Sequence, residues 1–133
     1  MPLPSSPDSP HITVVVDAAR RLIRVARTSI PLTGEADVDA MVRRARAELD
    51  RAGRRSNVLL IDLRVALLSD ETNYAAAMRK LRAEITRGFA RSAFLVTTSV
   101  GRIQVGRFLR EEHIDAPVFA DEAEALRSLG VTR

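Results

Sequence analysis

Two short apolar runs, each followed by a segment of helical period, constrain the fold of this chain more than any other feature. Residues 57–63 read NVLLIDL and residues 92–97 read SAFLVT. Continuous runs of this length are typical of strands that are covered on both faces, as in parallel sheets. Helical crossovers between parallel strands lie against the sheet. The sequence therefore predicts an α/β protein with a mixed, mostly parallel sheet.

An antiparallel hairpin is expected to open the fold. Residues 11–17 (HITVVVD) are rich in β-branched side chains, and residues 22–28 form a second strand-like run. A short turn at 18–20 separates the two runs, so they can pair directly. Asp17 is expected to hydrogen-bond locally in that turn.

Four segments of helical period complete the pattern, and each is bounded by capping residues. Ser99 is expected to cap the third helix, Gly53 and Gly130 to end the first and last, and Asp121 to cap the last. The third helix should bury Ile103, Val105 and Leu109. The expected helices span about 38–52, 73–89, 101–113 and 122–129, with a short edge strand at 117–119, giving the order β-β-α-β-α-β-α-β-α.

The domain organisation follows from where the prolines lie. Residues 1–10 hold four of the six prolines and three serines, so we expect a disordered tail there and a single domain over residues 11–133. The first residues lack a signal peptide, and no apolar run is long enough to cross a bilayer. We therefore expect a cytoplasmic protein with no membrane span.

Composition excludes several kinds of site. The chain has no cysteine and two histidines, which excludes disulfides, cysteine-ligated metals and thiol nucleophiles. Its net charge is +4, but acidic and basic residues are interleaved and aromatic residues make up only 4%. A platform for stacking bases is therefore poorly supplied, and nucleic acid is an unlikely partner. We expect no cofactor and no bound metal.

No arrangement of residues typical of an enzyme is found. The chain has no Ser-His-Asp order, no zinc-binding helix and no glycine-rich dinucleotide turn. Gly101 and Gly106 have the spacing of a phosphate loop but lack its lysine and the following Ser or Thr. Gly106 is instead expected to allow close packing of a helix. We therefore predict a protein that is not an enzyme.

The segment from Asp62 to Asn73 joins the most buried strand to the second helix. Loops at the carboxyl ends of parallel strands commonly surround ligands, so residues 64–72 and 98–101 are the loops to consider. Asp70 is expected to cap the second helix, with Glu71 adding a favourable charge to its first turn. On the residues alone, this segment is a capped helix start at the surface.

The element order over residues 12–129 resembles a STAS domain, the module of sulphate transporters and anti-sigma-factor antagonists. In the bacterial antagonists a buried strand ends in Asp or Asn, and a short loop leads to Asp-Ser-Ser-Gly, whose second serine is phosphorylated. Counted from Asp62, the sequence Asp70-Glu71-Thr72-Asn73 falls in that register. Asp70 matches the family acid and Thr72 the phospho-acceptor, whereas Glu71 and Asn73 differ from the pattern.

This resemblance implies a non-enzymatic bacterial regulatory module that binds a protein partner, such as a kinase or an anti-sigma-like protein. The implied binding surface is the loop and helix start, with phosphorylation of Thr72 as a modulator. Two alternatives remain open, a STAS-like protein for a small ligand or lipid and an oligomerising scaffold. The implied partner-binding residues are Asp70, Glu71, Thr72, Asn73 and Met78.

Overall fold

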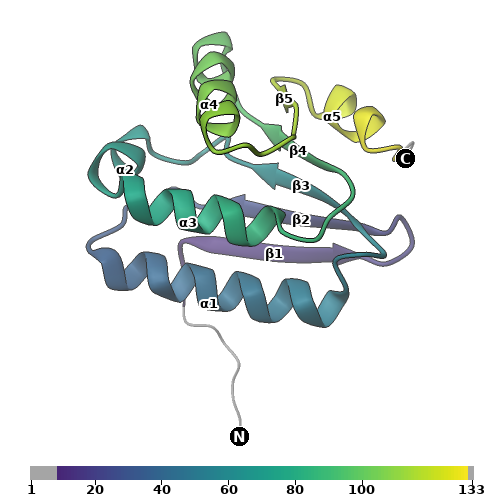
Figure 1. Cartoon of the computed structure of the whole chain (residues 1–133), viewed down its shortest axis with the longest axis horizontal. Helices are drawn as coiled ribbons and strands as arrows, with labels where there is room; N and C mark the ends of the chain where they lie inside the picture. The colour runs from purple at the N-terminus through teal and green to yellow at the C-terminus, as the bar shows by residue number, and fades with distance from the viewer. Residues whose placement is uncertain (1–8, 132–133) are drawn as a thin grey trace, which may run out of the picture.

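The computed structural model describes residues 9–131 as an α/β fold with a five-stranded mixed sheet and five helices (Figure 1). The strands lie in sequence order across the sheet, β1-β2-β3-β4-β5. Along the chain the elements are β1 (Ile12–Asp17), β2 (Leu22–Arg27), α1 (Glu35–Ala52), β3 (Val58–Asp62), α2 (Leu68–Asn73), α3 (Ala75–Thr86), β4 (Ser92–Leu95), α4 (Ser99–Glu111), β5 (Val118–Phe119) and α5 (Glu122–Ser128).

The predicted hairpin is confirmed at one edge of the sheet. β1 and β2 pair antiparallel, with Ile12 opposite Arg27 and Asp17 opposite Leu22. The Asp17 carboxylate accepts hydrogen bonds from the Arg20 backbone N–H at 3.2 Å and from its Nε at 2.7 Å, which fixes the turn. All later neighbours in the sheet pair parallel, so the sheet is mixed and mostly parallel as the sequence predicts.

Alternate residues of the strands face two separate cores, because successive strand side chains point to opposite faces. Leu59, Ile61 and Phe94 belong to the larger core, on the side of α1 and α3. Leu60 and Leu95 belong to a smaller core that is closed by α5. The buried strands β3 and β4 therefore have apolar side chains on both faces, which explains their uninterrupted apolar sequences.

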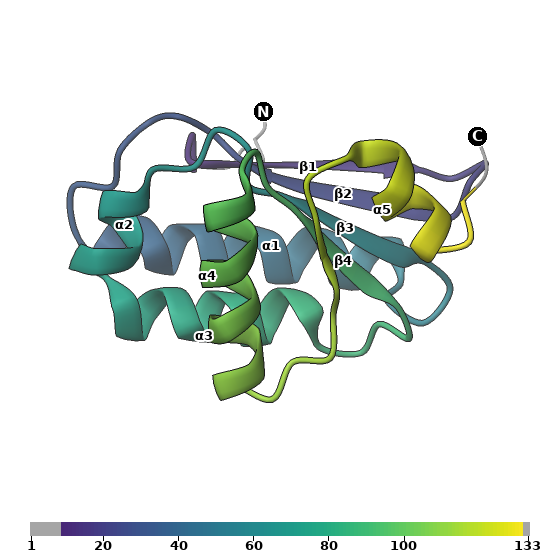
Figure 2. The ribbon, with the colours of Figure 1, turned by 90° about the horizontal axis from the view of Figure 1, so that it is seen from above.

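Helices α1 and α3 lie side by side over one face of the sheet, as both views show (Figures 1 and 2). α1 buries Val38, Met41, Ala45 and Leu49, a spacing of three or four residues that places them on one stripe. Gly53 follows with φ 96°, a left-handed conformation that favours glycine, and its N–H bonds the Leu49 carbonyl. The first helix thus ends where the sequence predicts.

The second predicted helix corresponds to α3, and a further short helix, α2, precedes it. α2 occupies part of the expected loop, and α3 begins only at Ala75, because Tyr74 has φ −131° and ψ 39° and interrupts the helical backbone. Of the expected disordered tail only Ser9 and Pro10 are described, and Ser9 is buried with its carbonyl accepting a hydrogen bond from Arg44 at 2.9 Å. Residues 1–8 lie outside the described residues.

Helix α4 differs from its prediction in three details. Thr98 rather than Ser99 caps it, accepting from the Gly101 N–H at 3.0 Å. Ile103, predicted to face the core, is 68% exposed, and Leu109 is the buried residue. A Cβ on Gly106 would meet only the flexible Arg110 side chain, at 3.6 Å, so Gly106 is not a site of close packing.

The carboxyl-terminal part of the fold agrees with the sequence. β5 forms the opposite edge of the sheet, beside β4. Asp121 caps α5 by accepting from the Ala123 N–H at 3.2 Å, and Gly130 follows with φ 81°. None of the helices in the described part of the chain is long and apolar enough to cross a membrane.

Candidate functional site

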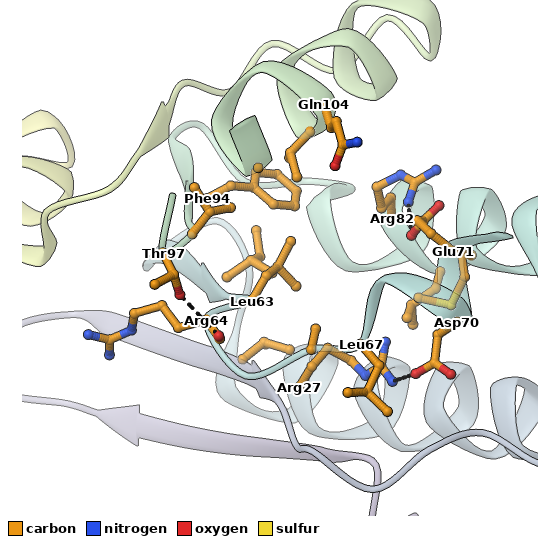
Figure 3. A pocket seen from close by; sticks show the side chains of 18 of the residues that line it. Arg27, Leu63, Arg64, Leu67, Asp70, Glu71, Arg82, Phe94, Thr97 and Gln104 are labelled. Carbon is orange, nitrogen blue, oxygen red and sulfur yellow. Dashed lines mark hydrogen bonds and ion pairs between the residues drawn. The ribbon is translucent and has the colours of Figure 1, made fainter. Parts of the chain in front are cut away.

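A cavity of about 360 Å³ lies at the carboxyl ends of β3 and β4. It is bounded by the loop at 63–67 with α2, by α3 and by α4, and Figure 3 shows it from close by. These are the two loop regions that the sequence indicates as neighbours of a ligand. Most of the lining is apolar, and its central side chains include Leu63 and Phe94, with Ile61, Val96, Met78 and Leu81 around them.

The directions of the helices explain why this space is left open. α3 runs along the sheet beside α1, whereas α4 crosses the direction of α3 steeply in both views (Figures 1 and 2). Its apolar residues therefore cannot pack along the length of α3. α4 buries only Leu109, and Val105 lies half-buried at the wall of the cavity.

A buried ion pair lies at one side of the cavity. Arg27 Nη2 donates to Asp70 Oδ2 at 2.8 Å, and both side chains are 4% exposed (Figure 3). The other Asp70 oxygen accepts from the Leu32 N–H at 3.3 Å, while Arg27 Nε donates to the His11 carbonyl at 3.1 Å. These hydrogen bonds compensate for the desolvation of the two charges and hold α2 against the end of β2.

The predicted role of Asp70 as a helix cap is therefore wrong. α2 starts before it, at Leu68, and Asp70 lies inside the helix with its carboxylate turned inward. An arginine at the end of β2, 43 residues away in sequence, determines this orientation. Asp70 is part of the cavity wall and not of an exposed acidic corner.

Arg82 of α3 joins the helices on the other side of the cavity. Its Nη1 donates to Glu71 of α2 at 2.7 Å, and its Nε donates to Glu112, just after α4, at 2.7 Å. The guanidinium also lies 5.0 Å from the centre of the Phe108 ring. Burial opposes the charge, but the hydrogen bonds with Glu112 and Glu71 outweigh it and raise the pKa of Arg82 above its usual value.

Further polar groups line the cavity between these ion pairs. Gln104 of α4 extends toward Arg82, as Figure 3 shows. Thr97 donates from its hydroxyl to the Arg64 carbonyl at 3.1 Å, which joins the two loops at the carboxyl ends of β3 and β4. The Arg64 guanidinium points away from the cavity and pairs with Asp62 and Glu122.

The five residues of the predicted partner surface are separated by the fold. Asp70, Glu71 and Met78 line the cavity, and Met78 is only 5% exposed. Direct contact of the Asp70 and Met78 side chains with a partner, as predicted, is inconsistent with this burial. Thr72 and Asn73 are exposed on α2. Thr72 also lines a second, shallower cavity of about 340 Å³ between α2–α3 and α4.

The site suits binding better than proton transfer or metal chemistry. Asp70 and Glu71, the carboxylates of its wall, are each already paired with an arginine. Among the described residues, no group of three or more His, Cys, Asp or Glu side chains is placed to hold a metal ion. What remains is a concave, partly open and largely apolar surface with a few polar groups, the usual composition of a small-molecule site.

Sequence reasoning located the loops around the cavity but not the cavity itself. One signal was present, because residues 65–67 read Val-Ala-Leu in a segment that was expected to be a surface loop. Apolar residues in such a loop indicate that the loop covers an apolar surface of the protein. The comparisons with known proteins add no further guide, since no family model, curated protein or solved structure matches the chain.

Proposed function

We propose that this protein is a non-enzymatic binding protein for a small, largely apolar molecule. The cavity beside Leu63, Phe94 and Met78 is the observation that carries this function. Its volume of about 360 Å³ falls within the range of roughly 300–1,000 Å³ that ligand sites occupy. Its position outside the carboxyl ends of parallel strands is where α/β sheets usually bind ligands.

The polar groups of the wall restrict the ligand further. Gln104 and Thr97 supply amide and hydroxyl groups beside an otherwise apolar surface. A ligand with an apolar body and at least one hydrogen-bonding group fits this lining. The two acidic side chains are already neutralised by Arg27 and Arg82, so the wall does not favour a cationic ligand.

Binding of anilinonaphthalene sulfonate, an amphipathic fluorophore with apolar rings and one sulfonate, tests the cavity, together with native mass spectrometry of protein purified from its host. Ala66→Phe places a ring at the cavity wall and should reduce probe binding at least tenfold. Ala47→Phe is the matched control, because Ala47 is exposed on α1. Equal probe binding by the two variants, or no bound molecule and no probe binding by the native chain, would contradict this function.

A second function is favoured by the exposure of Thr72 and Asn73 on α2. It is a STAS-like regulatory module, cytoplasmic and bacterial, whose partner contacts α2. The antiparallel hairpin followed by parallel strands supports this resemblance. A phosphate on Thr72 would lie in the same shallow cavity as Arg79 and Arg107 but also near Glu71, so it would change the charge that a partner meets.

Capture of partners from a host lysate tests this second function. Thr72→Glu and Asn73→Arg should each reduce capture, whereas Thr13→Glu, at an exposed position on β1, should not. Met78→Arg is unsuitable as a test, because a charge at this buried position would disrupt the core. Unchanged capture in both α2 variants, or no phosphate on Thr72 in a phosphopeptide map, would remove the corresponding part of this proposal.

A further inference from the structure

The outer face of α4 carries apolar side chains that the fold leaves exposed. Val100 is 65% exposed and Ile103 is 68% exposed, the highest values among the large apolar residues exposed in the described chain. They lie three residues apart, so they are neighbours on one side of the helix. Contact between such exposed apolar side chains and water is unfavourable, and a binding partner would bury them.

The same face continues as a cationic surface. Arg107 and Arg110 follow Val100 and Ile103 at helical spacing, and Arg102 lies on the flank; all three are exposed. None of the ion pairs among the described residues involves these three arginines. Of the two acids at the end of the helix, Glu112 is paired with Arg82, whereas Glu111 is exposed one turn beyond Arg107 and offsets part of the positive charge.

This surface adjoins the mouth of the apolar cavity. Val100 is exposed and also lines the cavity, so the two apolar surfaces are continuous. Val65, 56% exposed, lies between Arg64 and Ala66, which both line the cavity on the opposite loop. Exposed apolar side chains thus occur on both of the segments that flank the opening.

We propose that α4 docks on an anionic lipid bilayer, with Val100 and Ile103 entering the boundary of the acyl chains and the arginines contacting lipid phosphates. A helix with an apolar patch beside basic residues binds at such an interface through both effects. The net charge of +4 adds a general attraction to anionic lipid. The docking is inferred from the exposed face of α4 alone. Transfer of an apolar ligand between the bilayer and the cavity would in addition depend on the proposed function.

A bilayer accounts for these features better than an acidic protein partner does. An apolar ligand of the proposed kind partitions into membranes, and docking through α4 would place the mouth of the cavity against its source. Because few apolar side chains are available, binding should be weak and reversible. It should also decrease with added salt, because the arginines supply a large part of the attraction.

Co-sedimentation of the full chain with vesicles of phosphatidylserine and phosphatidylcholine, against vesicles of phosphatidylcholine alone, tests the docking. Binding should require the anionic lipid and fall with added salt. Near an anionic surface each basic residue contributes about fivefold in affinity, so R107Q/R110Q should lower binding by roughly twenty-five-fold. Ile103→Ser should lower it while leaving the charge unchanged.

Matched controls separate this surface from unspecific attraction. R43Q/R51Q removes the same charge from exposed positions on α1, and Val15→Ser changes an exposed valine on β1. Equal losses in the α1 and α4 pairs, no effect of Ile103→Ser, or capture of an acidic protein without vesicle binding would overturn the proposal. Ala66→Phe should bind vesicles normally while losing the fluorophore, so the failure of docking and the failure of the cavity are distinguishable.

Discussion

α1 and α4 lie on the same face of the sheet, but they use their apolar residues differently. α1 has 18 residues and buries four apolar side chains in one stripe, whereas α4 has 13 residues and buries one. α1 lies beside α3, so its stripe meets both the sheet and a neighbouring helix. α4 crosses steeply and is joined to α3 through the Arg82–Glu112 ion pair.

The difference shows what helical periodicity can and cannot predict. Apolar residues at helical spacing indicate that a segment is a helix in both cases. Whether the apolar stripe is buried depends on the direction of the helix relative to its neighbours, which the spacing does not contain. The side chains between α1 and the sheet are consequently closely packed, while a cavity remains where α4 crosses α3.

The largest effect should come from the buried ion pair beside the cavity. Asp70→Asn leaves the Arg27 charge buried without its carboxylate, which should lower the free energy of unfolding by about 3–5 kcal/mol. Urea denaturation measures this change. Asp17→Asn is the control, because the Asp17–Arg20 pair is about one-third exposed and solvent screening should leave it a much smaller contribution. Similar losses in the two variants would contradict the structural role of Asp70.

Leu49→Ala tests the filled half of the fold. Leu49 is fully buried between α1 and the sheet, so the cavity it leaves should cost about 2–5 kcal/mol of unfolding free energy. The same measurement on Val105→Ala, at the half-buried wall under α4, should give a smaller loss. If both substitutions cost the same, α1 and α4 do not differ as described.

The loss of stability at low pH through Glu84, between α1 and α3, should be smaller than the effects of these two substitutions. Burial raises the pKa of this carboxyl, but hydrogen bonds from Arg87 and Arg46 outweigh it and lower the pKa below its ordinary value of 4.5. A lowered pKa stabilises the fold above the ordinary value and loses that contribution as the pH falls through the folded-state pKa. Thermal melting should therefore show less acid destabilisation in Glu84→Gln than in the native chain, and an unchanged pH profile would exclude this contribution.

The smallest effect on stability is expected on the outer face of α4. Ile103→Ala removes a side chain that is mostly exposed, so the free energy of unfolding should change by less than about 0.5 kcal/mol. Thermal or urea unfolding of the variant and the native chain measures this change. A loss comparable to that of Leu49→Ala would mean that Ile103 is buried in solution, as the sequence alone predicts.

Local patterns predicted most of the fold. The hairpin was predicted correctly from the β-branched run before Asp17. α1 was predicted correctly from the stripe between Val38 and Leu49, because the helical pattern repeats over several turns. α2 has only six residues and no clear period, so it was assigned to a loop. The interruption at Tyr74 is a backbone feature that no local preference of the sequence signals.

The candidate site was less predictable because long-range charge pairs shape it. Asp70 has the sequence context of a helix cap, and only its distant partner Arg27 turns it inward. Arg54 gives a second example outside the site. It follows the end of α1, yet it is 7% exposed and donates to the Glu84 and Arg87 carbonyls at 2.6 and 2.7 Å.

The guanidinium of Arg82 is shared by carboxylates at two different walls of the cavity. If either Glu71 or Glu112 moved away, Arg82 would keep only part of its compensation inside a poorly hydrated environment. The two walls are thereby energetically coupled, because a shift of α2 or of α4 alone would break one of the two ion pairs of Arg82.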